Sequence, residues 1–233
     1  MTLPVAAQSY QVRHEHWRKS CSGMLTIGPD SIMFEERMPV KKGKEPHRFT
    51  WRFPDIQQLL LQPKRITVLT YEDVSSKFGV DRQYTFELGG DANFEGAYSD
   101  LKNRLDQRFV AAIQDGSVNP IWQIAVKHEL GYKGSQGILA IGEDRIVYRT
   151  DDPKDSRTWR YADIENISME GPFQLTVTTY ERKRTHYGNR KGFNFQLKEA
   201  LSEARFNDLW LRLEQGRSRG ILSAQQPAKE TTK

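Results

Sequence analysis

The residues nearest the N-terminus that could carry chemistry are His14 and His16, which form an H-x-H pair, and Cys21 in "RKSCSG". Side chains two residues apart on a strand point to the same face, so the two histidines could bind a metal ion. A zinc site needs three or four protein ligands, and this pattern supplies two. His128 occupies the matching position later in the chain, where Leu130 replaces the second histidine. We therefore expect structural roles for His14 and His128, with no metal and no cofactor.

Signals for catalysis are weak. A cysteine nucleophile needs a base and an orienting group, and Ser135 stands at the position that matches Cys21. The chain has no P-loop, no G-x-S-x-G turn and no glycine-rich dinucleotide turn. Asp55 in "PDI" and Asp163 in "ADI" could be catalytic acids, but each is expected in a different domain, so a turn-fixing role is preferred. The sequence predicts a protein that is not an enzyme.

Two other groups of residues are candidates for ligand contact. The segment 181–191, "ERKRTHYGNRK", forms a basic loop if it closes a hairpin, and its candidate anion-binding residues are Arg182, Lys183, Arg184, Arg190 and Lys191. Charged loops are more often simply solvated. Tyr71 in "LTYED" and Tyr180 in "TTYER" could line a groove, although a ring that covers the sheet is the preferred interpretation.

Composition limits the class of protein. A single cysteine excludes an internal disulfide and fits a reducing compartment, so we expect a cytoplasmic protein. No apolar run approaches the roughly 20 residues of a membrane span, and the start shows no secretory leader. The net charge is +5, but the tail 215–233 supplies much of the excess. A nucleic-acid partner is not expected, because such proteins carry a basic face on the folded domain.

The chain repeats itself. "VRHE" at 12–15 returns as "VKHE" at 126–129, and "TWRFPDI" at 50–56 returns as "TWRYADI" at 158–164. The offset falls from 114 to 108 between these blocks, as expected for matched elements joined by loops of different length. A period near 110 is far longer than a solenoid repeat and predicts two domains. The expected boundaries are an extension 1–9, domain 10–114, linker 115–121, domain 122–214 and a flexible basic tail 215–233.

Each repeat alternates apolar and polar residues through about seven segments, which predicts strands. Trp51 and Trp159 alternate with arginines and should face the two cores. The last segment changes to a helical period, with apolar residues at Tyr98, Leu101 and Leu105 and again at Phe206, Leu209 and Leu213. Ser202 is the expected N-cap of the second helix. The first helix is expected to run from about 94 to Gln114, so that Phe109 and Ile113 pack the two domains together; a homodimer is the alternative that would cover them.

The order G-x-L-x-I, D-x-I-x-F/Y, W-x-F/Y-x-D-I, T-Y-E, F-x-L, helix resembles the pleckstrin-homology (PH) superfold, and within it the GRAM-like and bacterial PH-like branch. The resemblance covers most of 10–110 and 122–214. It implies a mainly β protein with two tandem PH-like seven-stranded split β-barrels or sandwiches, each closed by a C-terminal α-helix. Many PH domains hold inositol phosphates with basic residues on the first two strands and the loop between them. Here that loop offers only Arg18 and Lys19, and Lys133 in the second copy.

These observations favour a non-catalytic tandem module that binds a protein or peptide as a scaffold or adaptor. An open sheet edge is the expected contact surface, because a bare strand edge can pair with an extended peptide. The alternative is a peripheral membrane module that binds anionic lipid through its basic loops. A metal-binding protein or a small enzyme ranks below both.

Overall fold

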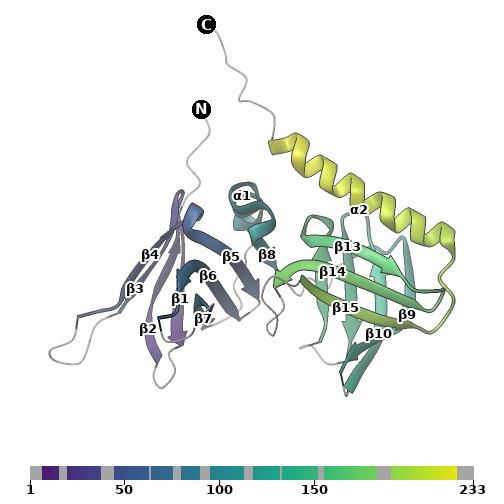
Figure 1. Cartoon of the computed structure of the whole chain (residues 1–233), viewed down its shortest axis with the longest axis horizontal. Helices are drawn as coiled ribbons and strands as arrows, with labels where there is room; N and C mark the ends of the chain where they lie inside the picture. The colour runs from purple at the N-terminus through teal and green to yellow at the C-terminus, as the bar shows by residue number, and fades with distance from the viewer. Residues whose placement is uncertain are drawn as a thin grey trace, which may run out of the picture. The chain divides into compact units, whose positions relative to one another are not determined.

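A computed structural model of the chain describes residues 7–15, 20–37, 45–62, 64–75, 80–89, 95–112, 118–131, 133–151, 155–182 and 190–224. It divides into two compact units, Met1–Ala112 and Ile113–Lys233. Each unit is built on its own sheet, and each is described by itself (Figure 1).

The first unit holds one eight-stranded sheet in the order β4-β3-β2-β1-β7-β6-β5-β8. Its first seven strands pair antiparallel, and β8 joins the edge of β5 in parallel. Helix α1 (Glu95–Leu105) precedes β8. The strands are β1 (Gln8–Glu15), β2 (Ser20–Ile27), β3 (Ser31–Glu36), β4 (Arg48–Arg52), β5 (Ile56–Gln62), β6 (Arg65–Asp73), β7 (Asp81–Leu88) and β8 (Phe109–Ala111).

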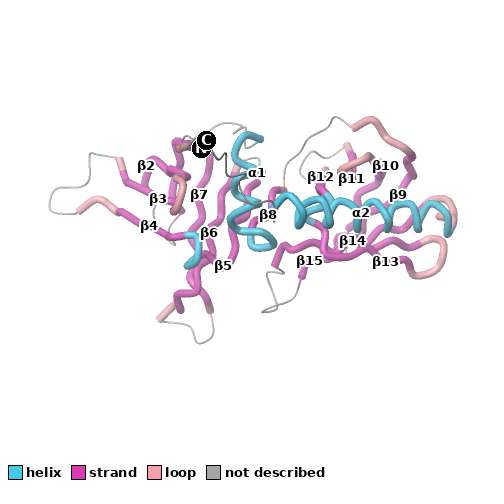
Figure 2. The backbone as a smooth tube through the Cα atoms, turned by 90° about the horizontal axis from the view of Figure 1, so that it is seen from above, coloured by secondary structure: helices cyan, strands magenta, loops and turns pink. Residues whose placement is uncertain are grey.

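The second unit repeats this arrangement with seven antiparallel strands in the order β12-β11-β10-β9-β15-β14-β13. The long helix α2 (Glu203–Ala224) follows the last strand and lies alongside β13 of its own sheet (Figure 2). The strands are β9 (Trp122–Leu130), β10 (Lys133–Ile141), β11 (Arg145–Thr150), β12 (Arg157–Arg160), β13 (Ile164–Met169), β14 (Gln174–Arg182) and β15 (Arg190–Leu197).

The two strand orders match position by position, from β4 with β12 to β5 with β13. The predicted fold class is therefore confirmed: the chain is mainly β, with two sheets of matching strand order, each followed in the chain by a helix, and in the first unit β8 comes after that helix. Both helices bury the apolar stripe expected of them, since Leu101, Leu105, Leu209 and Leu213 are all within 1 % of full burial. Ser202 accepts a hydrogen bond from the backbone N–H of Arg205 at 3.3 Å, so it caps α2.

A glycine at the same place in both units allows the sheet to bend sharply. A Cβ on Gly23 would lie 2.2 Å from the carbonyl oxygen of Glu35, and one on Gly137 would lie 2.0 Å from that of Arg149. No other residue fits so close to the neighbouring backbone. The glycine of the repeated G-x-L-x-I pattern thus serves the curvature of each sheet.

The end of the first helix differs from the sequence prediction. Helix α1 ends at Leu105, and the expected extension to Gln114 is wrong. Asp106 takes a left-handed backbone with φ of 49°, which stops the helix, and a short 3₁₀ turn leads into β8. Phe109 is completely buried, and it pairs with Leu59 of β5 in the parallel β5–β8 ladder. Phe109 therefore belongs to the sheet of its own unit, and Ile113 lies outside the described residues.

The second helix departs from the prediction in the opposite direction. The expected domain boundary at 214 falls inside α2, which continues to Ala224 through a segment expected to be a flexible tail. The Arg217 side chain donates to the backbone carbonyls of Ile164 and Glu165, so this part of the helix is attached to the start of β13. Among the described residues, no helix has the length and apolar character needed to cross a membrane.

Candidate functional site

The predicted basic loop is shorter than 181–191, because strands β14 and β15 occupy both of its ends. Arg182 ends β14 and is paired with Arg190, the first residue of β15. Lys183 and Arg184 lie outside the described residues. The structure thus brings Arg182 and Arg190 together, as a hairpin requires, but it places them on strands.

Acidic side chains already engage the two basic residues of β15. Lys191 lies 3.1 Å from Glu181, a carboxylate that is only 3 % exposed, and Arg190 lies 3.3 Å from Glu165. Arg190 also donates to the carbonyl of Tyr180, and the Lys191 ammonium stands 4.7 Å from the ring centroid of Phe193. These cations fix the strand ends through their contacts with protein groups. They are therefore less available to bind an anionic ligand.

The two candidate groove tyrosines, one in each unit, differ in exposure. Tyr71 is 57 % exposed, whereas Tyr180 is 7 % exposed and lies beneath the Arg190 guanidinium at 5.3 Å. A groove of about 770 Å³ does exist in the first unit, across strands β3, β2, β1 and β7. Neither tyrosine lines it, and its charged residues include the ion pair of Arg13 with Glu87. The burial of Tyr180 agrees with a ring that covers its sheet, whereas the exposure of Tyr71 does not.

The tryptophans and aspartates expected to have structural roles lie in the cores and in short turns. Trp51 and Trp159 are 4 % and 1 % exposed, one in each core. Asp55 and Asp163 each end a 3₁₀ turn before the following strand, the first exposed and the second fully buried. The two aspartates belong to different units, as expected from the repeat.

His128 is buried among aromatic rings in the second unit. Its ring centroid lies 5.6 Å from that of Tyr148 and 5.0 Å from that of Phe195. Burial lowers the pKa of His128; the nearby cations Arg157 and Lys191 lower it further, and Asp155 opposes them. The imidazole is therefore neutral at neutral pH.

This environment predicts acid sensitivity. The pKa of His128 is lower in the folded chain than the value of about 6.5 in the unfolded chain. Its stabilising contribution is complete above pH 6.5 or so and is lost as the pH falls toward the folded pKa. In urea unfolding at about pH 7 and about pH 5, the wild type should lose more stability than His128→Phe, whose ring suits the same aromatic surroundings. Equal losses in both proteins would contradict the prediction.

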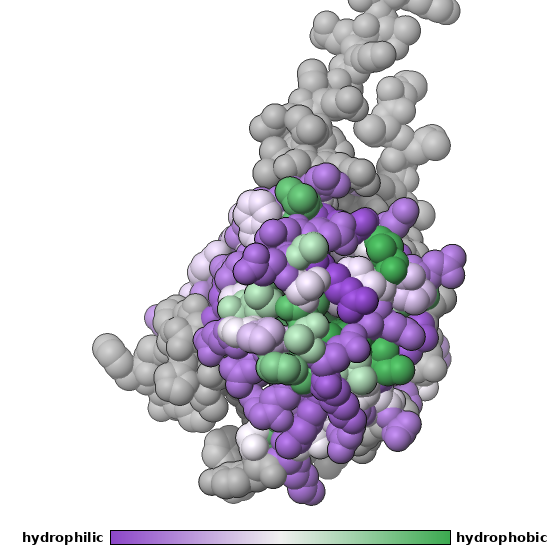
Figure 3. All heavy atoms as spheres, turned by 90° about the vertical axis from the view of Figure 1, so that its right-hand side faces the viewer, coloured by the Kyte–Doolittle hydropathy of each residue, from purple (hydrophilic) through white to green (hydrophobic). Residues whose placement is uncertain are grey.

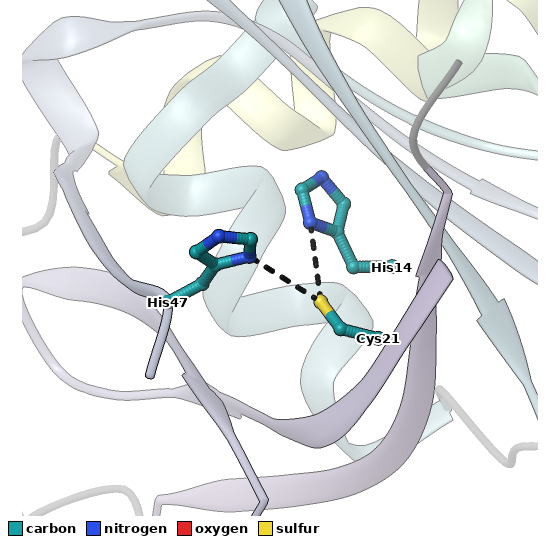
Figure 4. Close-up of side chains that lie close together, drawn as sticks. All are labelled: His14, Cys21 and His47. Carbon is teal, nitrogen blue, oxygen red and sulfur yellow. Dashed lines mark hydrogen bonds between the residues drawn. The ribbon is translucent and has the colours of Figure 1, made fainter. Parts of the chain in front are cut away.

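The counterpart of His128 in the first unit is His14, and there a second histidine and the single cysteine join it (Figure 4). The Cys21 Sγ lies 3.9 Å from His14 Nδ1 and 3.6 Å from His47 Nδ1. All three potential ligand atoms are within 4.8 Å of one another. His14 and Cys21 are direct partners across the β1–β2 ladder, and His47 immediately precedes β4.

The cluster does not suit nucleophilic catalysis. Burial, with a smaller effect from the Glu36 carboxylate, raises the pKa of the Cys21 thiol to about 11. The thiolate is the reactive form of cysteine, so very little is present at neutral pH in the metal-free chain. Cys21 also lies within strand β2.

Sequence reasoning found two members of this cluster and missed the third. His14 and Cys21 were each considered, but His47 lies 26 residues beyond Cys21, and His16 was the expected companion. His16 lies outside the described residues. The repeat offers one signal for His47. At the offset of 108 that relates Trp51 to Trp159, the second copy has Asp155 at the position of His47, so this histidine is particular to the first unit.

One sheet edge also differs between the units. In the first unit, the outer side of β5 is covered by β8, with Leu59, Leu60 and Leu61 opposite Phe109, Val110 and Ala111. In the second unit, β13 ends the sheet, and no strand of the described residues pairs with its outer side. The chain after β15 continues as helix α2 instead of returning as a strand.

Exposed apolar side chains are found on the second unit as well. Figure 3 shows hydrophobic residues in small groups among hydrophilic ones on one face of this unit. The large exposed ones in the second unit are Ile121, Leu130, Ile138, Phe173, Trp210 and Leu211. Hydrophilic residues interrupt these groups, so the face shows no continuous apolar surface (Figure 3).

No family model matches the chain. No curated protein sequence matches it either.

Solved structures do match. They include the C-terminal domain of an unknown protein from Leishmania infantum, with 14 % identity, 42 % of this chain and 81 % of that chain covered, and a TM-score of 0.31. The Spt16D Pob3N heterodimer matches with 12 % identity over 76 % of this chain and 85 % of that one, at a TM-score of 0.34. The Slm1 PH domain in complex with D-myo-inositol 4-phosphate matches with 9 % identity over 42 % of this chain and 92 % of that one, at a TM-score of 0.30.

Proposed function

We propose that the chain is a non-catalytic binding module that accepts an extended peptide of a partner protein as an added strand along β13. The observation behind this proposal is the difference between the two sheet edges. The edge of β5 holds an added strand, β8, whereas the matching edge of β13 has none among the described residues. An uncovered strand edge presents backbone donors and acceptors that an extended peptide can pair with.

The first unit supplies a template for the complex. Using the offset of 108, Leu59 and Leu61 correspond to Ile167 and Met169. The Leu61 carbonyl accepts a hydrogen bond from the Ala112 N–H at 2.7 Å, so its backbone faces the added strand. Because backbone direction alternates along a strand, the matching outward groups of β13 belong to Ile167 and Met169.

The template also indicates the length and chemistry of the peptide. Strand β8 has three residues, Phe-Val-Ala, and all three are buried. On β13, the Arg217 side chain already occupies the carbonyls of Ile164 and Glu165, which leaves 166–169 for pairing. A short apolar segment that runs parallel to β13 fits this stretch.

The membrane alternative has less support from the described residues. Lys191 is paired with Glu181 and Arg190 with Glu165. Their positive charges are therefore partly compensated and attract an anionic membrane less. Each free basic residue near an anionic surface contributes about 1 kcal/mol, and salt weakens that attraction. We expect little or no binding to vesicles of anionic lipid at physiological salt.

A peptide-binding experiment tests the proposal. A fluorescent peptide with the sequence QRFVAAI, taken from residues 107–113, should bind the full chain saturably, as measured by fluorescence anisotropy. Met169→Pro removes one outward N–H and should weaken binding about tenfold, the value of one hydrogen bond of roughly 1 kcal/mol or slightly more. Met169→Ala keeps the N–H and is the matched control, with an affinity close to the wild type.

Three outcomes would count against this function. The first is no saturable binding by folded wild type, and the second is equal binding by Met169→Pro and Met169→Ala. The third is clear sedimentation with anionic vesicles that is abolished when Arg182, Lys183 and Arg184 are changed to alanine, which would favour the membrane module. A dimer of the wild type that Met169→Pro dissociates, measured by light scattering, would make a second copy of the chain the occupant.

A further inference from the structure

We propose that His14, Cys21 and His47 bind one Zn²⁺ ion in the first unit, a site separate from the β13 edge. The three residues come from different strands or strand ends and turn their Nδ1, Sγ and Nδ1 atoms toward one another (Figure 4). One thiol and two imidazoles form a ligand set of the kind found in zinc proteins.

The distances between these atoms fit a single tetrahedral ion. Bond lengths of about 2.3 Å to sulfur and 2.0–2.1 Å to nitrogen place sulfur and nitrogen ligands about 3.6 Å apart. The observed distances from Cys21 Sγ are 3.6 Å to His47 Nδ1 and 3.9 Å to His14 Nδ1. Both sulfur-to-nitrogen distances are therefore within a few tenths of an ångström of the value for one shared ion.

The surrounding structure fixes the positions of His14 and Cys21. The His14 ring is 4 % exposed and lies against Phe86, Phe34 and Phe49, with centroid distances of 4.9, 5.4 and 5.5 Å. The β1–β2 ladder fixes Cys21 opposite it. His47 is exposed, so it leaves a route from solvent for the ion.

An acidic residue stands beside the cluster. The Glu36 carboxylate accepts a hydrogen bond from the His47 backbone N–H at 2.9 Å, and its Oε2 lies 3.5 Å from His47 Nδ1. Binding exchanges the thiol proton of Cys21 for the metal and releases that proton to solvent. The resulting thiolate and the Glu36 carboxylate together balance the charge of the ion. Water completes the coordination.

The ligand types favour zinc over magnesium and calcium. A thiolate and two imidazoles suit zinc, whereas magnesium and calcium require oxygen ligands. The matching positions of the second unit are His128, Ser135 and Asp155, and there the Ser135 hydroxyl is hydrogen-bonded to the Tyr148 hydroxyl at 2.8 Å. Without the sulfur and the second imidazole, the second unit should not hold zinc. The expected stoichiometry is one ion per chain.

Metal titration of the untagged full chain tests the site. The metal-free protein should take up one Zn²⁺ in competition with a chromogenic chelator. With Co²⁺ it should develop a thiolate-to-cobalt charge-transfer band and the visible bands of tetrahedral cobalt. Cys21→Ser and His47→Asp introduce the residues that the second unit carries, so both should fold. Each should weaken zinc binding by about 100-fold or more and remove the charge-transfer band or alter the tetrahedral spectrum.

His128→Gln is the matched control in the second unit and should leave stoichiometry and affinity unchanged. Circular dichroism of each metal-free variant checks that it is folded. Failure of folded wild type to bind one zinc ion overturns the proposal. Zinc affinity retained in either Cys21→Ser or His47→Asp, or lost in His128→Gln, overturns it as well. Binding of copper without binding of zinc in the same competition would also contradict the proposal.

Discussion

Replacing Trp159 with alanine should lower the free energy of unfolding of the second unit by about 3–5 kcal/mol, the range for a large buried aromatic side chain. Trp159 is 1 % exposed, and its ring packs against Phe193 and Phe195 with centroid distances of 4.8 and 6.1 Å. Its indole nitrogen is buried without a hydrogen-bond partner among the described residues, so the loss comes from packing and the cavity left behind.

Urea unfolding followed by circular dichroism measures this effect. Trp210 is the matched control, because it is 45 % exposed on α2 and its replacement by alanine should change stability by no more than about 0.5 kcal/mol. A loss below about 1 kcal/mol in Trp159→Ala would show that the tryptophan does not support the core.

Lys191→Met should also destabilise the second unit, by about 2–3 kcal/mol, since it leaves a buried carboxylate without its nearest cation. Glu181 is 3 % exposed, and its second cation, Arg157, is farther away at 3.9 Å. Lys191 is itself partly exposed, so the expected loss is smaller than for a completely buried pair.

The same unfolding measurement with Lys133→Met is the control, because Lys133 is exposed at the start of β10 and its loss should be within about 0.5 kcal/mol. Equal stability of the Lys191 and Lys133 variants would mean that solvent screens the Glu181 pair. Lys191 would then be as available to an anionic ligand as the sequence suggested.

Local pattern was sufficient for the elements whose burial follows a regular period. The alternation around Trp51 and Trp159 predicted which faces are buried, and the stripe through Leu209 and Leu213 predicted the face of α2. The repeated blocks predicted that two units share one fold, and the strand orders agree. These predictions succeeded because the buried face of a strand or helix can be identified from the order of apolar and polar residues within that element alone.

The end of α1 shows where local pattern fails. Phe109 continues the spacing of the helix stripe, yet it lies in β8 beside Leu59. The left-handed backbone at Asp106 and the free edge of β5 together outweigh the helical spacing. In the second unit, Glu214 stands at the position of Asp106 and the helix continues through it.

The candidate sites divide in the same way. The sequence by itself determined the strands, their buried faces, the duplication and the presence of His14 and Cys21 on adjoining segments. Only the tertiary structure decided that His47 meets them, that Lys191 is engaged by Glu181, and that no described strand pairs with the outer side of β13 whereas β8 pairs with β5. The physical reason is that these contacts join residues from separate strands. Their distances are set by pairing register and sheet curvature, which the spacing of residues within one strand does not specify.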